Sequence, residues 1–447
     1  MDSQLLLSEI AEMADGQLIG ADIKVDGFTT DTRQLGSGDL FIALAGEKYD
    51  GHDFIHAQLS SQVKALFVHR EVDSTLPKVV VKDTLKGLSC WATAWRHHVD
   101  PYVIAVTGSN GKTTVKQMLA SVFAQAGKTY CTRGNLNNHI GVPLTLLQCK
   151  KDAEYAVIEM GANHIGEIDH LSRLTQPNIA IITNAGPAHL EGFGSLNGVA
   201  HGKGEIINGL MDAGHIILNA DDKYCAFWLQ KAEHVHAVTF GFSQQADIRG
   251  QLNGQQLSVY IDEQALLINL PLPGRHNACN ALAVVAAASV AGLSAQQIRQ
   301  GLEQMHQESA RLEFKRTSQG AQIIDDSYNA NPASLKAAIE VLCAQSRQAW
   351  LVLGDMGELG AEELSIHEQM GKFAKSAGIK KLFALGELSR YAVQGFGEGA
   401  IHFETHQQLS DALTQQLEQD CSVLVKGSRS MQMEKIVEAV THLQSLH

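Results

Sequence analysis

The stretch over residues 103–116, VIAVTGSNGKTTVK, constrains this chain more than any other. Its apolar beginning, residues 103–106, is typical of a buried parallel strand. A glycine-rich turn follows, and Lys112 then opens a run with apolar residues at helical spacing. Strand, glycine turn and helix together suit a phosphate, because glycines let backbone N–H groups converge on the anion and the helix N-terminus adds partial positive charge. The stretch therefore predicts a phosphate-binding loop.

The loop departs from the ordinary P-loop pattern, G-x-x-x-x-G-K-[ST]. Val106 stands five residues before Gly111, where that pattern has glycine, and Gly108 is only three residues before Gly111. The loop is therefore shortened, and an ordinary glycine-rich turn between a strand and a helix is the alternative. As a phosphate loop, it predicts that Lys112 reaches the β- and γ-phosphates of a nucleotide and that the Thr113 hydroxyl faces Mg²⁺.

Length and charge exclude several classes of protein. A length of 447 residues suggests about two to four domains, and 45% hydrophobic with 19% charged residues indicates a globular chain. The net charge of −13 argues against bulk binding to nucleic acids or anionic membranes, but leaves room for a local basic pocket. Because the chain contains no run of about 18 apolar residues, we expect no membrane insertion.

The cysteines and the N-terminus favour a cytoplasmic protein. The seven cysteines are scattered and form no C-x-x-C pair, which fits buried thiols in a reducing compartment better than disulfides or a zinc site. Residues 1–16, MDSQLLLSEIAEMADG, lack a basic stretch and predict an amphipathic helix rather than a signal peptide.

The pattern of apolar runs predicts an α/β protein of three domains, which comprise residues 1–82, 83–307 and 308–447. The first is a small α/β domain, and a helix over residues 83–100 leads into the second. In the central domain, near-continuous apolar strands alternate with helices, so we expect a parallel sheet covered on both faces, the fold of a P-loop-type ATPase domain. The third domain restarts this alternation and is Rossmann-like, without G-x-G-x-x-G. Beyond 103–106, the main expected strands run over residues 155–162, 178–186, 215–221, 321–326, 349–355, 380–386 and 422–428.

Ligands of such sheets collect at the carboxyl ends of the strands, which groups residues 107–114, Glu159, residues 184–189 and residues 219–222 in one neighbourhood. Glu159 ends a buried strand, so its carboxylate needs a partner, either Mg²⁺ near Thr113 or a helix cap or ion pair.

Two further residues near these strand ends have open roles. His189 follows the next strand, and it is either a hydrogen-bonded structural residue or a ligand of a second metal. Lys203, in HGKGE, has by its charge alone the character of a surface lysine.

Polar loops elsewhere also have two readings. Residues 29–33, TTDTR, predict either a solvated turn or a site for a nucleotide-sugar diphosphate. Residues 325–332, DDSYNANP, end a strand and suit a ribose or an amine, or simply cap the following helix. Residues 354–360 and 426–429 end later strands in the same way, and three polar strand ends on one sheet edge favour a second half-site.

The shortened loop TGSNGKTT resembles that of the Mur ligases and the related folylpolyglutamate synthetases. The stretches GRHNACNALA (274–283), DDSYNANP (325–332) and NADD (219–222) agree, so the resemblance covers essentially the whole chain. Within the family, the chain looks most like the members that add D-alanyl-D-alanine to UDP-N-acetylmuramoyl-tripeptide, on the stretches TRGNLNNHIGVP (132–143), ANHIGEI (162–168), HLEGFGS (189–195), GDMGELG (354–360) and VKGSRS (425–430). The DNPR signature of the members that add the third residue is absent.

The resemblance implies roles for residues in each domain. In the N-terminal domain, Thr32 and Arg33 would lie nearest the diphosphate of the UDP part. The C-terminal domain would close over the cleft and bring Asp326, Asn329 and Arg429 to ATP and the dipeptide. The residues that would contact ATP in the central domain are Gly108, Ser109, Asn110, Gly111, Lys112, Thr113 and Thr114 around the phosphates, with Asn277 and Asn280 beside the adenine.

The resemblance also implies two Mg²⁺ ions. Thr113 and Glu159 would hold one, and His189 would help to hold the second. Lys203 would be carbamylated by CO₂, and its new carboxylate would supply an oxygen ligand of the kind a hard metal prefers. Lys112, His189 and Lys203 are thus the expected catalytic residues.

The activity implied is ATP-dependent amide formation through an acyl phosphate, in peptidoglycan precursor synthesis and hence in cell wall biogenesis, cell shape and cell division. We expect a cytoplasmic monomer whose partners are these small substrates. The alternatives are another Mur-type ligase, a folylpolyglutamate synthetase, or, from a different class, a nucleotide-dependent binding module. A binding module needs no second metal, so the trio of Glu159, His189 and Lys203 speaks against it.

Overall fold

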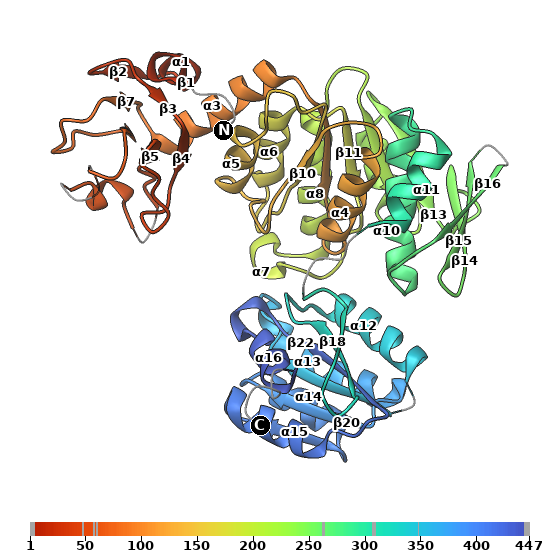
Figure 1. Cartoon of the computed structure of the whole chain (residues 1–447). Helices are drawn as coiled ribbons and strands as arrows, with labels where there is room; N and C mark the ends of the chain where they lie inside the picture. The colour runs from red at the N-terminus through yellow and green to blue at the C-terminus, as the bar shows by residue number, and fades with distance from the viewer. Residues whose placement is uncertain are drawn as a thin grey trace.

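The computed structural model describes residues 5–46, 49–56, 59, 61–261, 264–305, 310–346 and 348–441. Figure 1 shows three bodies, with the C-terminal part of the chain lying below the central part and the N-terminal part beside it. The three main sheets use strands within residues 17–80, 102–269 and 313–426. The predicted α/β architecture of three units is confirmed, while the boundaries at residues 82 and 307 stay predictions.

The N-terminal part contains a five-stranded sheet in the order β2-β7-β6-β5-β4, parallel except for β2. The helix predicted over residues 1–16 is shorter than expected. Residues 1–4 lie outside the described residues, and residues 5–6 form a strand that pairs with β3. The elements are β1 (Leu5–Leu6), α1 (Leu7–Met13), β2 (Gln17–Ile19), β3 (Lys24–Val25), β4 (Gly27–Thr29), β5 (Asp39–Ile42), η1 (Gly51–Phe54), β6 (Ala65–Val68) and β7 (Lys78–Val80).

Helix α3 (Thr84–Val99) joins the N-terminal and central parts, as the sequence predicts. Trp91 stacks on Phe67 of the N-terminal sheet, with 6.2 Å between the ring centroids. One turn further along, Trp95 donates its indole N–H to the carbonyl oxygen of Cys149, at 3.0 Å, in the central part. Both tryptophans are buried, so one helix anchors the two parts by its aromatic side chains.

The central part is built on a nine-stranded sheet in the order β16-β15-β14-β13-β12-β11-β8-β10-β9. All neighbours from β14 to β9 in this order, β8 included, pair in parallel. Strands β15 and β16 extend the sheet by antiparallel pairing. The strands are β8 (Tyr102–Thr107), β9 (Thr129–Cys131), β10 (Tyr155–Glu159), β11 (Ile179–Ile182), β12 (His215–Asn219), β13 (His236–Gly241), β14 (Ile248–Asn253), β15 (Gln256–Ile261) and β16 (Gln264–Asn269). The helices are α4 (Lys112–Phe123), α5 (Gly141–Leu147), α6 (Glu167–Thr175), α7 (Leu190–Phe193), α8 (Leu196–Gly204), η2 (Glu205–Gly209), α9 (Cys225–Lys231), α10 (Arg275–Val290) and α11 (Ala295–Glu303).

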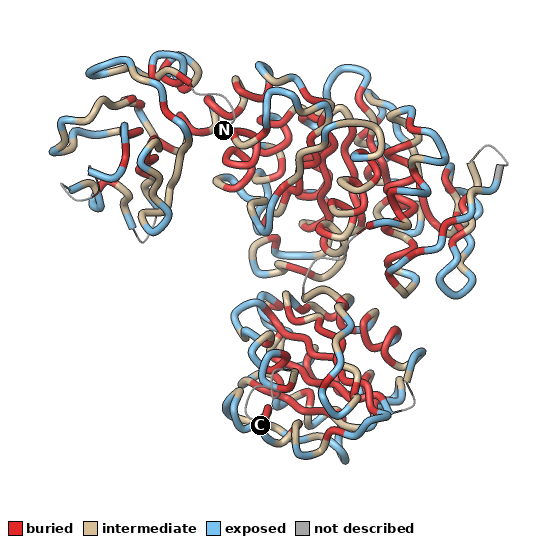
Figure 2. The backbone as a smooth tube through the Cα atoms, viewed as in Figure 1, coloured by how far each residue is buried: buried red, intermediate tan, exposed pale blue. Residues whose placement is uncertain are grey.

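Both faces of this sheet are buried, and β8 shows why its sequence is apolar without alternation. Val103 and Ala105 join the core on the side of α3, α6 and α8, whereas Ile104 and Val106 join the core on the side of α4 and α10. All four side chains are fully buried. Figure 2 shows the same continuous burial through the middle of the central part. The predicted parallel sheet with two covered faces is confirmed.

The C-terminal part has a six-stranded sheet in the order β17-β18-β22-β19-β20-β21, parallel except for β17. The two edge strands, β17 (Glu313–Arg316) and β21 (Ala400–Phe403), were not expected. Edge strands are short and half-exposed, so their sequences lack a continuous apolar run. The other elements are β18 (Gln322–Asp326), α12 (Pro332–Gln345), β19 (Gln348–Gly354), η3 (Gly360–Glu362), α13 (Glu363–Ala377), β20 (Lys381–Leu385), α14 (Ser389–Phe396), α15 (His406–Gln416), β22 (Cys421–Lys426), η4 (Arg429–Met431) and α16 (Glu434–Thr441).

Two expectations about the whole chain can be compared with the structure. In the described part of the chain, no helix combines the length and the apolar character needed to cross a membrane. The seven cysteines are free thiols, as expected, but only Cys149, Cys225 and Cys421 are buried; Cys90 is exposed and the other three are partly buried.

Candidate functional site

A cavity of about 710 Å³ lies between the central and C-terminal parts, where the carboxyl ends of their parallel strands meet. The phosphate loop and the ends of β10 and β11 form one wall, and the end of β18 with the start of α12 forms the opposite wall. Of the residues singled out by the sequence, this cavity brings together Ser109, Asn110, Gly111, Lys112, Thr113, Thr114, Glu159, His189, Asn277, Asn280, Asp326 and Asn329.

The glycines of the shortened loop are fixed by close contacts. Gly108 has φ +147° and Gly111 has φ +82°, backbone conformations that favour glycine. A Cβ atom on Gly108 would lie 1.9 Å from the Thr183 hydroxyl oxygen, and one on Gly111 would lie 2.4 Å from Asn280 Oδ1. Neighbouring side chains therefore leave no room for a Cβ atom at these two positions, which explains why both are glycine.

The end of β11 holds the loop in place. Asn184 Oδ1 accepts the backbone N–H of Asn110 at 3.0 Å, and the Thr183 hydroxyl donates to the Asn110 carbonyl oxygen at 2.6 Å. The Ser109 hydroxyl donates to the carbonyl oxygen of Gly186 at 2.9 Å. The loop conformation is thus set by side chains before any ligand arrives.

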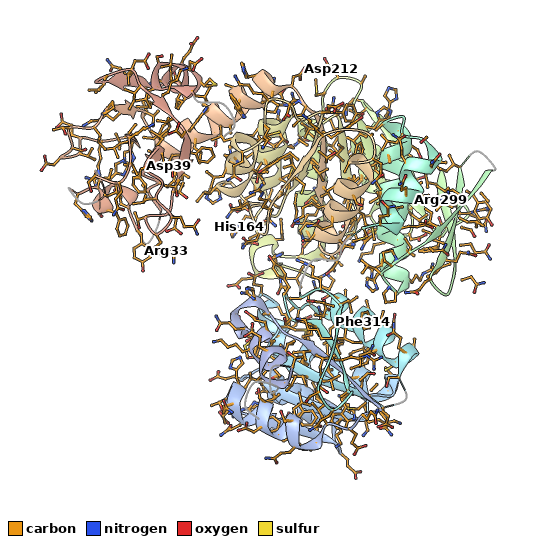
Figure 3. All side chains as sticks on the ribbon, in the orientation of Figure 1. Arg33, Asp39, His164, Asp212, Arg299 and Phe314 are labelled. Carbon is orange, nitrogen blue, oxygen red and sulfur yellow. The ribbon has the colours of Figure 1, made fainter. Side chains whose placement is uncertain are left out.

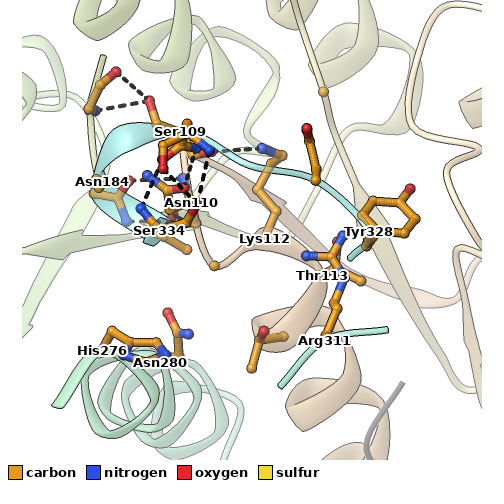
Figure 4. A pocket seen from close by; sticks show the side chains of 18 of the residues that line it. Ser109, Asn110, Lys112, Thr113, Asn184, His276, Asn280, Arg311, Tyr328 and Ser334 are labelled. Atoms are coloured by element: carbon orange, nitrogen blue, oxygen red, sulfur yellow. Dashed lines mark hydrogen bonds between the residues drawn. The ribbon is translucent and has the colours of Figure 1, made fainter. Parts of the chain in front are cut away.

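The Lys112 side chain folds back over the loop, and its ammonium donates to the Gly108 carbonyl oxygen at 2.7 Å. Figure 4 shows Arg311 and Tyr328 of the C-terminal part facing the same space, and the Arg311 guanidinium lies 4.1 Å from the Tyr328 ring centroid. The N-terminus of α4, whose first N–H groups lack intrahelical acceptors, opens here too. Two cations and a helix N-terminus therefore make this part of the cavity suitable for a polyphosphate.

Glu159 is buried at the end of β10, and its two carboxylate oxygens differ. Oε1 accepts the Thr113 hydroxyl at 3.3 Å and the Asn137 side-chain amide at 2.9 Å. Oε2 is buried without a hydrogen-bond partner among the described residues, and its neighbour is the Lys116 ammonium at 3.6 Å. A buried carboxylate oxygen that accepts no hydrogen bond and lies near a threonine hydroxyl is a suitable ligand for a hard cation such as Mg²⁺.

The described residues contain no group of three or more His, Cys, Asp or Glu side chains that would hold a metal without help. A cation at Glu159 would therefore take its remaining ligands from the Thr113 hydroxyl, water or phosphate oxygens, as Mg²⁺ usually does in nucleotide sites.

Lys203 is buried, which corrects the surface-lysine interpretation. Its side chain is 1% exposed, and the amine donates to the Ala162 carbonyl oxygen at 3.3 Å under the Phe193 ring, whose centroid is 5.0 Å away. Burial, together with the positive charge of Lys112, lowers the pKa of Lys203 to about 7, although Glu167 and Glu205 oppose the shift. A sizeable fraction of this amine is therefore uncharged near neutral pH.

His189 lies on the cavity wall in a left-handed backbone conformation, with φ +55°. Its Nδ1 atom forms an ion-pair contact with the carboxylate of Glu358, which belongs to the C-terminal part. A hydrogen bond from His189 lowers the pKa of Glu358. His189 therefore bridges the two parts of the chain.

On the opposite wall, Asp326 forms a buried ion pair with Lys426, whose ammonium also donates to the Asn329 carbonyl oxygen at 2.9 Å. His276, at the start of α10, faces this pair across the cavity. Burial lowers the pKa of His276 to about 4; the nearby charges oppose each other, since Asp326 raises it and Lys426 lowers it. His276 is therefore neutral at physiological pH.

Comparisons with known proteins decide the family. The Mur ligase family, catalytic domain matches residues 24–90, the Mur ligase middle domain matches residues 106–288, and the Mur ligase, glutamate ligase domain matches residues 310–429. The UDP-N-acetylmuramoyl-tripeptide–D-alanyl-D-alanine ligase of Escherichia coli is 42% identical, over 97% of this chain and 98% of that protein. The chain belongs to the Mur ligase family.

Other relatives of this Mur ligase agree. The Bacillus subtilis protein with the same name is 36% identical over 97% of both chains. A crystal structure of MurF from Acinetobacter baumannii superposes with a TM-score of 0.91 at 33% identity, covering 98% of this chain and 99% of that one. The Thermotoga maritima MurF ligase in complex with ADP shares the fold, with a TM-score of 0.83 at 24% identity and coverage of 93% and 97%. The predicted family and the predicted ligase class are confirmed.

Some of the residues predicted for this Mur ligase do not line the cavity. Arg33 is 86% exposed at the edge of the N-terminal part, where it pairs with Asp31 at 2.8 Å (Figure 3). Arg429 is 60% exposed and pairs with Glu434, also at 2.8 Å. The predicted residues outside the cavity wall are Thr32, Arg33, Gly108, Lys203 and Arg429.

Residues of the site that were not predicted from the sequence include Lys116, Asn137 and Arg311. Lys116 follows Lys112 by one helical turn, and this spacing could have placed it on the same side of α4. Asn137 belongs to a stretch that carries the family resemblance but was given no role, whereas Asn331 caps α12, as one of the two interpretations of residues 325–332 predicts. No sequence pattern around Arg311 predicts that it lies in the site, because its position depends on how the C-terminal part docks.

Proposed function

We propose that this chain is the ATP-dependent ligase that joins D-alanyl-D-alanine to UDP-N-acetylmuramoyl-tripeptide in peptidoglycan precursor synthesis. The observation that carries the proposal is the meeting of Lys112, the Thr113–Glu159 pair and Asp326 in one cavity. The substrates come from the names of relatives that are similar over nearly the whole chain.

The tripeptide carboxylate is a poor electrophile, so the reaction first has to convert it into a good one, an acyl phosphate. An oxygen of the tripeptide carboxylate attacks the γ-phosphorus of ATP, the bond from that phosphorus to the bridging oxygen breaks, and ADP leaves. The amine of D-alanyl-D-alanine then attacks the acyl carbon of the acyl phosphate, loses a proton, and phosphate departs. Side chains do little covalent work, so positioning and charge neutralisation supply most of the acceleration.

The phosphate loop and Lys112 would hold the transferring phosphates, with the cation turning from the Gly108 carbonyl toward the γ-phosphate. Asn277 and Asn280, on the cavity wall, would lie beside the adenine, and Asp326 and Asn329 would contact ATP from the C-terminal domain. Closure of that domain would exclude water, which otherwise hydrolyses an acyl phosphate.

Two Mg²⁺ ions belong to the proposal. Thr113 and Glu159 would hold one, which Glu159 Oε2 supports, since this buried oxygen accepts no hydrogen bond from the described residues. His189 and a carbamate on Lys203 would hold the other, and the depressed pKa of Lys203 supports its reaction with CO₂, because only the uncharged amine is nucleophilic. When bound, the ions supply positive charge against the negative charge that develops on the phosphates.

The remaining assignments are also proposals. The exposed Arg33, with Thr32, would bind the UDP diphosphate within domain 1–82, while domains 83–307 and 308–447 enclose the ATP site. Arg429 would reach the dipeptide after domain closure. We propose a cytoplasmic monomer without a nucleic-acid partner, in keeping with free cysteines and a net charge of −13.

A phosphate-release assay tests the function. Purified protein is given ATP, Mg²⁺ and UDP-N-acetylmuramoyl-tripeptide, with and without D-alanyl-D-alanine; a parallel reaction contains a folate with glutamate. We expect phosphate release that depends on D-alanyl-D-alanine, together with the pentapeptide product in mass spectra. Release stimulated only by glutamate with the folate would identify a polyglutamate synthetase, and ATP binding without acceptor-dependent release would identify a binding module.

A further inference from the structure

One side chain of the C-terminal part makes direct contact with the phosphate loop. Asn331 donates its side-chain amide to Asn110 Oδ1 at 2.6 Å, although the two residues are 221 positions apart in the chain. Figure 4 shows Asn110 surrounded by Asn184 of the central part and by Ser334 from the start of α12. The contact thus joins the first turn of α12 to the centre of the loop.

The Asn331 side chain is fixed before it reaches the loop. It is the N-cap of α12, where its Oδ1 accepts the backbone N–H of Ser334 at 2.9 Å, and the Ser334 hydroxyl accepts the backbone N–H of Asn331 at 3.1 Å. This reciprocal cap restricts the Asn331 rotamer, so the amide group points at Asn110 without further loss of side-chain freedom.

Asn110 is held through its backbone by the central part. Its backbone N–H is bound by Asn184 Oδ1, and its carbonyl oxygen accepts from Thr183 and from the Asn184 amide. Its side-chain oxygen is bound by Asn331 of the C-terminal part. The middle of the phosphate loop is therefore clamped between the end of β11 and the start of α12.

We propose that Asn331 is a positioning residue that couples docking of the C-terminal domain to the geometry of the phosphate loop. The inference rests on the proposed function, since it takes the loop to be the ATP phosphate site. When the domain is docked, the Asn331–Asn110 hydrogen bond fixes the loop for phosphoryl transfer. When the domain swings away, the bond breaks and the loop loses one of its restraints.

The variant Asn331→Ser separates this role from helix capping. Serine is about as good an N-cap as asparagine, so α12 keeps its start, but the shorter side chain cannot reach Asn110. Because small misplacements of reacting groups cost up to about 100-fold in rate, we expect kcat to fall by about 10- to 100-fold while the KM for ATP changes less. The matched control is Thr405→Ser, which alters the N-cap of α15 in the same domain, at a residue that does not line the cavity.

A double-mutant cycle identifies the partner. If Asn331 acts through Asn110, the double variant Asn110→Ala with Asn331→Ser loses no more activity than Asn110→Ala alone. Wild-type kcat in Asn331→Ser, or losses that multiply in the double variant, would overturn the proposal. Asn331→Thr repeats the test if the serine variant does not fold.

Hydrogen exchange gives a readout that needs no turnover. In the full-length protein, Asn331→Ser should speed exchange of the backbone amides at residues 108–112, and Thr405→Ser should not. Unchanged exchange with an active wild-type enzyme contradicts the coupling. A wild-type protein without acceptor-dependent turnover contradicts the proposed function instead, so the two failures are distinguishable.

Discussion

The Lys116 ammonium lies 3.6 Å from Glu159 Oε2, and both side chains are buried. The buried ammonium therefore lies against the carboxylate oxygen that is proposed to hold Mg²⁺. The same pairing opposes metal binding, because the Lys116 ammonium and Mg²⁺ would compete for Glu159 Oε2.

Replacing Lys116 with Met should therefore make stability depend on the metal. The variant leaves Glu159 buried without its cation, so we expect the free energy of unfolding in urea to fall by about 3–5 kcal/mol in the presence of EDTA. Mg²⁺ with ATP should recover part of that loss by binding the folded state. The control is Lys128→Met, which breaks an exposed pair with Asp152 and should cost less than about 1 kcal/mol. A loss of equal size with and without MgATP would show that Lys116 is unrelated to the metal site.

Lys112→Met tests the phosphate loop. The variant keeps the length of the side chain but removes the charge that would neutralise the γ-phosphate, so kcat/KM should fall by at least about 100-fold. The melting temperature should stay near that of the wild type, because the hydrogen bonds of Lys112 to described residues go only to the loop carbonyls of Gly108 and Ser109. Lys372→Met, on the exposed face of α13, serves as the control and should leave kinetics unchanged. Near-normal kinetics in Lys112→Met would contradict the assignment of the loop.

Parts of the site that depend on sheet topology were predictable from the sequence. Strands β8 and β10 are neighbours in a parallel sheet, so the loop after β8 and Glu159 at the end of β10 had to meet at one edge. The glycine turn between β8 and α4 follows from the same local pattern. These predictions needed only periodicity and the rule for strand ends.

Other parts depend on packing between distant segments. Lys116 has the sequence character of a solvated helix position, yet it is fully buried because its partner arrives on β10. Lys203 was expected at the surface for the same reason, since charge alone does not reveal the cover supplied by Phe193. Arg311 and Asn331 enter the site only when the C-terminal part docks. Periodicity indicates which side of a helix or strand a residue occupies, but it does not show which distant segment will cover that residue.

Lys203→Ala tests the carbamate. Removing the amine removes the proposed metal ligand, so activity should be lost and then partly restored by short carboxylic acids such as acetate, which place a carboxylate in the vacated space. In the wild type, ¹³C-bicarbonate should give a carbamate NMR signal that is absent from the variant. Lys223→Ala, at an exposed position, is the control. Full activity of Lys203→Ala in the absence of added acid would rule out the carbamate.

His276 should make the protein sensitive to acid. Burial holds the pKa of the folded-state imidazole at about 4, whereas in the unfolded chain it returns to about 6.5. Between these values the unfolded state binds a proton that the folded state does not, so the contribution of His276 to stability is present above pH 6.5 and falls as the pH drops toward 4. His276→Gln removes this titration. We therefore expect urea denaturation to show a smaller loss of stability between pH 7 and pH 4.5 in His276→Gln than in the wild type. His97→Gln, at an exposed position on α3, is the control and should follow the wild type. Parallel losses in His276→Gln and the wild type would mean that the buried imidazole does not drive acid unfolding.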